Sequence, residues 1–130
     1  MAAIYLDSSA LVKLAIGEPE SGALRRYLRR RRPLVSSALA RVEVLRALLL
    51  EGEEGIARGR EVLRRIELFR VNDWVLTMAG ALLPLELRSL DAIHLATASQ
   101  LGEDLGPIVA YDSRLLDAAE HLGMRTVSPS

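Results

Sequence analysis

Four carboxylates in this chain occupy positions that folding alone does not require: Asp7, Glu43, Asp91 and Asp112. If they converge, each close pair of like charges repels by roughly 4 kcal/mol at 4 Å and an effective dielectric of 20, so a cation has to offset them. The chain has no cysteine and no pair of histidines at ligand spacing. An all-oxygen cluster is what Mg²⁺ or Mn²⁺ prefers, and such ions activate water and neutralise charge on a phosphodiester. The four acids therefore predict metal-dependent phosphodiester hydrolysis.

Two of the acids, Asp7 and Asp112, end short apolar runs. Residues 3–6 and 107–111 are apolar enough for buried strands, and each acid is followed by a serine and then by a pattern with helical spacing. In an open parallel sheet, functional groups gather beyond the carboxyl ends of the strands, where the loops leave a crevice. The simpler alternative is that each aspartate only caps the helix that follows it.

Glu43 lies on a helix that we expect over residues 38–50. Its neighbours at helical spacing are apolar, namely Leu39, Ala40, Ala47 and Leu50. The carboxylate therefore falls within an apolar stripe, and a buried glutamate without a partner is costly. The alternative is a residue at the edge of the stripe with its head in water.

Asp91 falls in the first turn of a helix expected over residues 90–101, with Ser89 as its N-cap. The helix dipole favours a negative charge there by a few tenths of a kcal/mol, which explains an acid without any function. The helix is apolar on nearly every side, however, and this predicts burial with the first turn beside the strand ends. His94 lies one turn further on, and we expect it to be a packed, hydrogen-bonded side chain.

The remaining elements alternate along the chain. Strands are expected at 34–37, 68–71, 108–111 and 125–127, and further helices at 9–16, 20–31, 53–66 and 74–83. This alternation predicts βαβ units around a parallel sheet, an α/β fold. The length of 130 residues fits a single domain, and a hydrophobic fraction of 50% is ample for its core.

Composition limits the compartment and the partners. No apolar run approaches the roughly 18 residues of a membrane span, and the absence of cysteine is compatible with a reducing cytosol, so we expect a cytoplasmic protein. The net charge is zero, so whole-molecule attraction to nucleic acid is not indicated. Six arginines fall between Arg25 and Arg32, and a charged face in water is a simpler interpretation of them than RNA contact.

Four segments make the sequence resemble the PIN-domain nucleases, and most closely the VapC toxins of type II toxin–antitoxin modules. They are residues 6–14, Glu43-Val44, residues 90–98 and residues 111–115. The segments arrive in the family's order and spread over nearly the whole chain. The Leu-Asp-Ala-Ile-His-Leu-Ala run that begins at Leu90 is the most specific of them. The resemblance implies one PIN domain over residues 1–130, a three-layer α/β/α sandwich with a central parallel sheet in the order 3-2-1-4-5.

The same resemblance implies roles for residues. The four acids match the family's acidic quartet, which binds Mg²⁺ or Mn²⁺ and cleaves RNA, and Ser9 and Ser113 match positions that support the site. Arg88, directly before the acidic helix, is a candidate for substrate contact. Arg114 stands where many members carry a further acid, so the resemblance leaves a second metal ion open.

The resemblance also implies partners. A VapC-like ribonuclease would form a homodimer and be held inactive by a cognate VapB-type antitoxin, whose C-terminal segment covers the acidic groove, often with an arginine among the carboxylates. A guanidinium there would supply positive charge and exclude the metal.

Other functions stay open at this point. The same nuclease fold could process RNA without being a toxin, or could bind RNA or serve as a scaffold without catalysis. A phosphotransfer domain also places an aspartate after its first strand, but the dehalogenase type wants a second aspartate where Ser9 stands. The receiver type wants a late lysine, and the only lysine here is Lys13.

Overall fold

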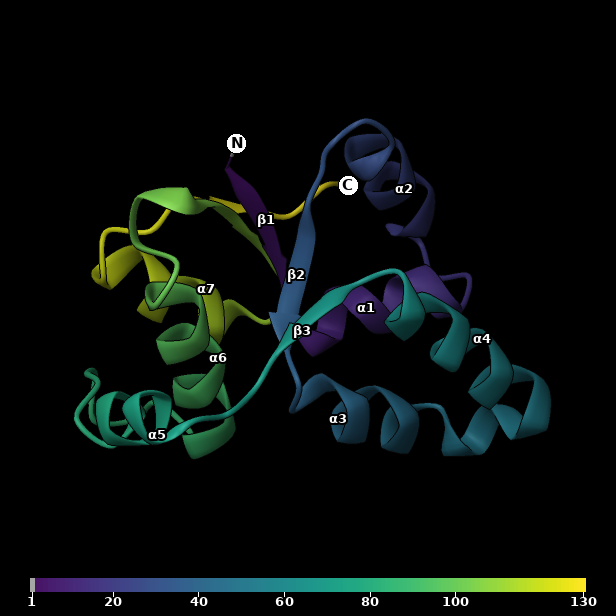
Figure 1. The fold of residues 1–130 in the computed structure, drawn as a ribbon. Coiled ribbons are helices and arrows are strands. Elements are labelled where there is room, and N and C mark those ends of the chain that lie inside the picture. The colour runs from purple at the N-terminus through teal and green to yellow at the C-terminus, as the bar shows by residue number, and fades with distance from the viewer. Residues whose placement is uncertain (1) are drawn as a thin grey trace.

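A parallel sheet of five strands forms the centre of the computed structural model, which describes residues 2–130 (Figure 1). The strands lie in the order β3-β2-β1-β4-β5, and every neighbouring pair is parallel. This confirms the expected α/β class and strand order. The bounds are β1 Ala3–Leu6, β2 Leu34–Ser37, β3 Glu67–Phe69, β4 Leu105–Val109 and β5 Thr126–Val127.

The central strand, β1, is buried along its whole length. Its side chains alternate between two cores, as the period of a strand requires. Ile4 and Leu6 enter one core, whereas Ala3 and Tyr5 enter the other. A strand covered on both faces reads as a continuous apolar run, which is why the sequence marks it so clearly.

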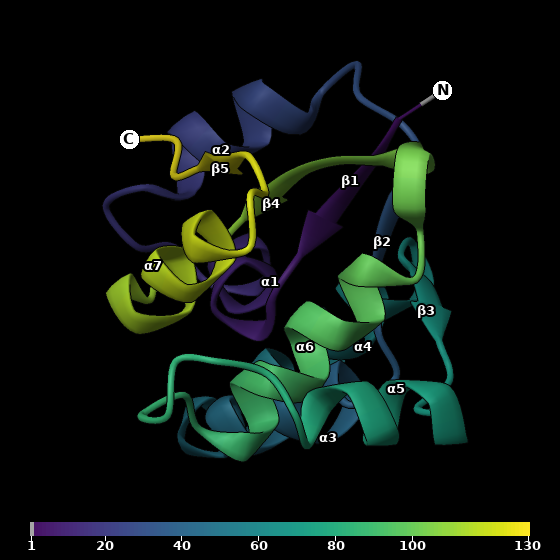
Figure 2. The ribbon, with the colours of Figure 1, turned by 90° about the vertical axis from the view of Figure 1, so that its left-hand side faces the viewer.

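Helices cover both faces of the sheet and complete three layers (Figures 1 and 2). The core on the Ile4 side is filled from four helices: α1 Ser8–Ala15, α2 Ser21–Leu28, α3 Ala40–Ala47 and α4 Gly52–Arg64. The opposite core is filled from α6 Ser89–Ser99 and α7 Ser113–His121, and α5 Asp73–Ala79 packs against α6. The expected α/β/α sandwich is confirmed.

The helix that carries Glu43 is shorter than expected. It ends at Ala47, and the chain continues as a 3₁₀ turn, η1 Leu49–Glu51, before Gly52 adopts a positive φ of 72°. The tighter turn rotates the side chains that follow, so that Leu50 is 98% exposed. The prediction that Ala47 and Leu50 belong to a buried apolar stripe of this helix is therefore wrong, because both are exposed, whereas Ala40 is buried and Leu39 is half-buried as predicted.

Close packing of α4 against α3 depends on a glycine. A Cβ at Gly59 would lie 2.6 Å from Cδ1 of Leu48 and 3.4 Å from Cδ2 of Leu45. The glycine weakens α4 as an isolated helix, but it lets α4 approach the end of α3 and so fixes the helix that presents Glu43.

The helices are also short. The longest, α4, has 13 residues, and none in the described range of residues 2–130 combines the length and apolarity that crossing a membrane would take. A second short 3₁₀ turn, η2 Gly102–Asp104, leads from α6 into β4.

Candidate active site

The carboxyl ends of β1 and β4 bring Asp7 and Asp112 to the same edge of the sheet. Asp7 caps α1, because its Oδ1 accepts a hydrogen bond from the Ala10 amide at 3.0 Å. Asp112 caps α7 by accepting from the amides of Arg114 at 2.8 Å and Leu115 at 3.4 Å. The capping alternative is thus correct in geometry. Both caps use Oδ1 only, so capping does not consume the second oxygen of either carboxylate.

Asp7 is the most deeply placed acid of the four, with only 5% of its surface exposed. Burial raises the pKa of its carboxyl, and the nearby charge of Asp112 adds to that rise. Hydrogen bonds from the Ser9 hydroxyl, at 2.6 Å, and from the Ala10 amide oppose it. The net direction is upward, so ionised Asp7 is held in the fold at a cost.

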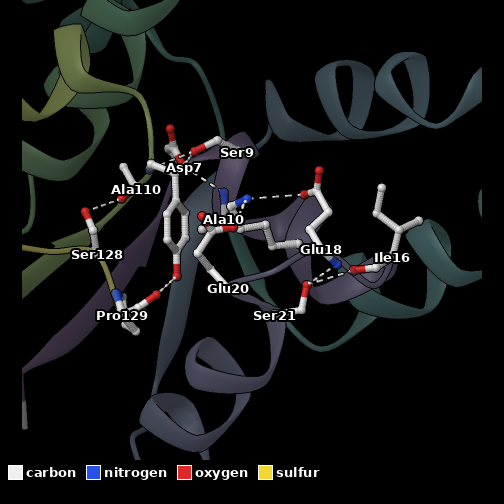
Figure 3. A network of polar contacts seen from close by, with 12 residues as sticks. Asp7, Ser9, Ala10, Ile16, Glu18, Glu20, Ser21, Ala110, Ser128 and Pro129 are labelled. Carbon is white, nitrogen blue, oxygen red and sulfur yellow. Dashed lines mark hydrogen bonds and ion pairs between the residues drawn. The ribbon is translucent and has the colours of Figure 1, made fainter.

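Ser9 ties the two strand ends together. Its hydroxyl donates to Asp7 and accepts from the Tyr111 amide at 3.1 Å. Figure 3 shows Ser9 directed at Asp7 beside the start of α1, and the same network continues to the C-terminal residues. There the Tyr111 hydroxyl donates to the carbonyl of Pro129 at 2.7 Å. Ser9 therefore lies where a supporting residue was predicted.

Glu43 is held by two partners on other elements. Its Oε1 accepts from the Ser8 hydroxyl and lies 2.6 Å from Nε2 of His94. Burial alone would raise the pKa of Glu43, but the hydrogen bonds from His94 and Ser8, together with the charge of His94, outweigh it and lower that pKa. The carboxylate is 22% exposed, so it sits at the edge of the apolar stripe with its head fixed by partners.

His94 continues the chain of contacts into the core. It is 2% exposed, and its Nδ1 lies 2.8 Å from the buried hydroxyl of Tyr5. The two ring nitrogens of His94 therefore link Glu43 to Tyr5. The expectation of a packed, hydrogen-bonded histidine is confirmed. The Tyr5–His94–Glu43 chain itself was missed, although a lone tyrosine in an aliphatic strand is a usable signal for such a contact.

Asp91 lies in the first turn of α6, as expected, and its side chain is 14% exposed. The cap, however, is not Ser89. That serine is the first residue of the helix, and Arg88 occupies the N-cap position with an extended backbone. The prediction of a Ser89 cap is therefore wrong by one residue, and the shift places the Arg88 side chain over the first turn of α6.

Arg88 joins two of the acids. Its Nη2 lies 3.1 Å from Oδ2 of Asp91 and 2.8 Å from Oδ2 of Asp112. The two carboxylates raise the pKa of Arg88 further, Asp91 more than Asp112. One guanidinium thus relieves the repulsion between a carboxylate on α6 and a carboxylate at the start of α7.

The four acids are not arranged as a ready set of metal ligands. In the described chain, no group of three or more acidic or histidine side chains is arranged to hold a metal ion. The cause is visible in the contacts: Glu43 faces Ser8 and His94, while Asp91 and Asp112 share Arg88. The donor chemistry, carboxylate oxygens without thiolates, fits Mg²⁺ or Mn²⁺, and Arg88 engages two of those donors.

The other residues singled out in the sequence are placed less centrally. Ser113 is the exposed first residue of α7, and Arg114 beside it is also exposed. The arginine run lies on α2 and the segment that leads into β2, at the opposite end of the sheet from the acids (Figure 1). All six of its arginines are exposed, as a charged face in water requires.

The PIN domain family model matches residues 4–121. The chain therefore belongs to the PIN-domain family.

Its relatives within that family are VapC proteins. Ribonuclease VapC46 of Mycobacterium tuberculosis is 64% identical over 130 residues, which span all of both chains. Ribonuclease VapC35 of the same organism is 44% identical over 97% of this chain and 96% of its own. The predicted resemblance to VapC-type PIN toxins is confirmed.

Two solved structures share the fold. VapC20 of Mycobacterium tuberculosis, described as a sarcin–ricin loop cleaving toxin, superposes with a TM-score of 0.75 at 18% identity, over 97% of this chain and 99% of its own. A toxin–antitoxin complex from Klebsiella pneumoniae contains a chain with a TM-score of 0.71 at 23% identity, over 98% of both chains. At these identities the structures support the fold alone.

Replacing Asp7 with asparagine should stabilise the metal-free protein at neutral pH. Because the pKa of Asp7 is higher in the folded protein than its unfolded value of 3.8, protonated Asp7 stabilises the fold at low pH. That stabilisation is lost as the pH rises through the pKa of the folded state. Asparagine keeps an oxygen for the Ala10 cap without the buried charge. We expect the melting temperature in chelator to rise by about 3–5 °C at pH 7.5 and to match the wild type near pH 3.5. A lower melting temperature at pH 7.5 would contradict this assignment.

Glu43→Gln should act in the opposite direction. Because the pKa of Glu43 is lower in the folded protein than its unfolded value of 4.5, ionised Glu43 stabilises the fold above that pH. That stabilisation is lost as the pH falls through the pKa of the folded state. The amide weakens the contact with His94, so unfolding should become easier by about 1–3 kcal/mol at pH 7.5, with the deficit fading in acid. Thermal melts of both variants over one pH series check this, and equal shifts for Asp7→Asn and Glu43→Gln would refute it.

Tyr5→Phe should destabilise the fold because it leaves Nδ1 of His94 buried without its partner. The expected cost is about 1–3 kcal/mol, measured by urea unfolding. Tyr27→Phe is the matched control. Tyr27 is only half-buried on α2, so its replacement should lower the free energy of unfolding much less. Equal losses for the two tyrosines would show that the contact with His94 does not carry the effect.

Proposed function

We propose that this chain is a metal-dependent endoribonuclease that hydrolyses RNA phosphodiester bonds and acts as the toxin of a VapBC toxin–antitoxin pair. Two kinds of support agree. Asp7 and Asp112 follow neighbouring parallel strands at the carboxyl edge of the sheet, and Arg88 joins Asp112 to Asp91. The chain is also 64% identical, along its full length, to a protein named as a ribonuclease. The observation that carries the mechanism is that all four acids lie at an N-cap or in the first turn of a helix, with Arg88 joining Asp91 to Asp112.

In this proposal Asp7, Glu43, Asp91 and Asp112 are the catalytic and metal-binding residues. A bound Mg²⁺ or Mn²⁺ would supply an activated water and neutralise charge on the phosphodiester. The chain's own part is to place oxygens for it. The Oδ1 atoms of Asp7 and Asp112 are held by helix caps, which leaves Oδ2 of each outside the cap.

Supporting residues hold those acids in place. Ser9 fixes Asp7 against the end of β4, while Ser8 and His94 fix Glu43. Ser113 is the first residue of α7, next to Asp112, and its hydroxyl is proposed to support the metal site. Arg88 has a side chain 55% exposed at the mouth of the site, which suits a guanidinium that meets RNA phosphate.

The proposed partners follow from the same site and relatives. An acidic edge that binds a cation also attracts a basic segment, so a VapB-type antitoxin is the proposed inhibitor. A fold neighbour is part of a toxin–antitoxin complex, which supports this. We further propose a homodimer of single-domain chains that acts on RNA in the cytoplasm.

The cleavage test uses purified, antitoxin-free protein and an RNA pool that contains ribosomal, transfer and messenger RNA. Asp91→Asn should reduce cleavage by about 100-fold or more, because it removes a carboxylate oxygen from the metal site. Cleavage should require Mg²⁺ or Mn²⁺ and stop in chelator. Asp104→Asn is the matched control, since Asp104 lies before β4 at the opposite end of that strand from Asp112.

Each outcome of that test has a meaning. Loss of cleavage in Asp91→Asn with normal cleavage in Asp104→Asn supports the nuclease. Cleavage that survives both Asp91→Asn and chelator would overturn the metal mechanism. RNA binding without any cleavage would favour a non-catalytic RNA-binding or scaffold domain. Cleavage without growth arrest on expression would favour a PIN nuclease that processes RNA without being a toxin.

A further inference from the structure

Arg88 already occupies two of the oxygens that a metal ion would use. Its Nη2 lies within 3.1 Å of Oδ2 of Asp91 and within 2.8 Å of Oδ2 of Asp112. The same side chain places Nε at 3.2 Å from Oδ2 of Asp91. The guanidinium therefore bridges a carboxylate on α6 and another at the start of α7, as a shared cation would.

The local backbone explains why Arg88 reaches both acids. It is the N-cap residue of α6 and has an extended conformation, with φ −71° and ψ 150°. Asp91 follows three residues later in the first turn of the helix, where positions three apart are neighbours. Asp112 lies three residues after the end of β4 and is the N-cap residue of α7. The arginine thus spans the gap between two elements that only tertiary packing brings together.

The ion pairs between Arg88 and the two aspartates are accessible to water and can be broken. Arg88 has 55% of its side chain exposed and Asp112 has 32%, and ion pairs in water are weak and easily exchanged. Asp91 is less exposed, at 14%. A guanidinium and a divalent ion both bind carboxylate oxygens. If one of them occupies Oδ2 of Asp91 and Asp112, the other binds those oxygens more weakly.

We propose that Arg88 is a built-in competitor for the metal site: it neutralises Asp91 and Asp112 in the metal-free protein, and a divalent cation binds by displacing it. This inference rests on the proposed function, since it assumes that these acids hold the cation. The displaced guanidinium stays at the mouth of the site, where it is free to pair with an RNA phosphate.

The test compares Mn²⁺ binding by calorimetry in the full-length wild type, Arg88→Gln and Arg114→Gln. Arg114 is the matched control because it is an exposed arginine two residues after Asp112, and its backbone amide, not its guanidinium, donates a hydrogen bond to that carboxylate. We expect Arg88→Gln to bind Mn²⁺ about 10-fold more tightly, within the range that neighbours of a metal site impose. Arg114→Gln should stay within about 3-fold of the wild type, the effect of losing one screened charge.

A second readout separates competition from a structural role. In chelator, Arg88→Gln should melt at a lower temperature than the wild type, because Asp91 and Asp112 then repel each other without relief. In saturating Mn²⁺ the difference should vanish or reverse. A merely structural arginine would lower the melting temperature by the same amount in both conditions.

The failures can be told apart. If the wild type binds Mn²⁺ at the four acids and Arg88→Gln binds it equally or more weakly, competition is wrong while the metal site stands. If neither protein binds Mn²⁺, although both are folded, the metal site of the proposed function fails and the competition fails with it. Equal tightening in Arg114→Gln would show a general charge effect and would also overturn the role of Arg88.

Discussion

Repulsion among carboxylates gathered at one edge of the sheet is the constraint on which the rest of the site depends. Each acid has its charge offset locally: helix amides cap Asp7 and Asp112, His94 and Ser8 hold Glu43, and Arg88 bridges two acids. The arrangement is costly for Asp7, whose pKa is raised by burial, and favourable for Glu43, whose pKa is lowered. Enzymes commonly lose some stability where function requires a buried charge. In this chain the destabilising charge is that of Asp7, the most buried of the four acids.

The scaffold makes this gathering possible in a chain of modest size. Parallel strands bring Asp7 and Asp112 to one edge because β1 and β4 are neighbours in register, with Leu6 opposite Val109. Packing of α6 against the same sheet carries Asp91 to that edge and buries His94 against Tyr5. On the other face, the close approach of α4 at Gly59 fixes α3 and therefore Glu43. Each acid comes from a different element, so the site exists only in the folded chain.

The sequence predicted the parts that local pattern controls. Asp7 and Asp112 were recognisable because a buried strand, an acid and a helix start follow one another, and Asp91 because its helix is apolar all round. Strand order came from the resemblance of the motifs and not from periodicity. Two things were out of reach. Partner choice among side chains, such as Arg88 with Asp112 or Tyr5 with His94, depends on contacts 24 and 89 residues apart in the chain. The end of α3 and the exposure of Leu50 depend on a 3₁₀ turn and Gly52, which compete with a helical pattern that runs on to Leu50.

The most direct measurement is a crystal structure of the antitoxin-free protein grown with Mn²⁺, with the ion located by its anomalous scattering. The account predicts a Mn²⁺ peak among the four acids, Asp7, Glu43, Asp91 and Asp112, with the Arg88 guanidinium withdrawn from Asp91 and Asp112. A fully liganded Mn²⁺ elsewhere on the molecule, or no peak at millimolar Mn²⁺ with Arg88 still bridging the two acids, would contradict it.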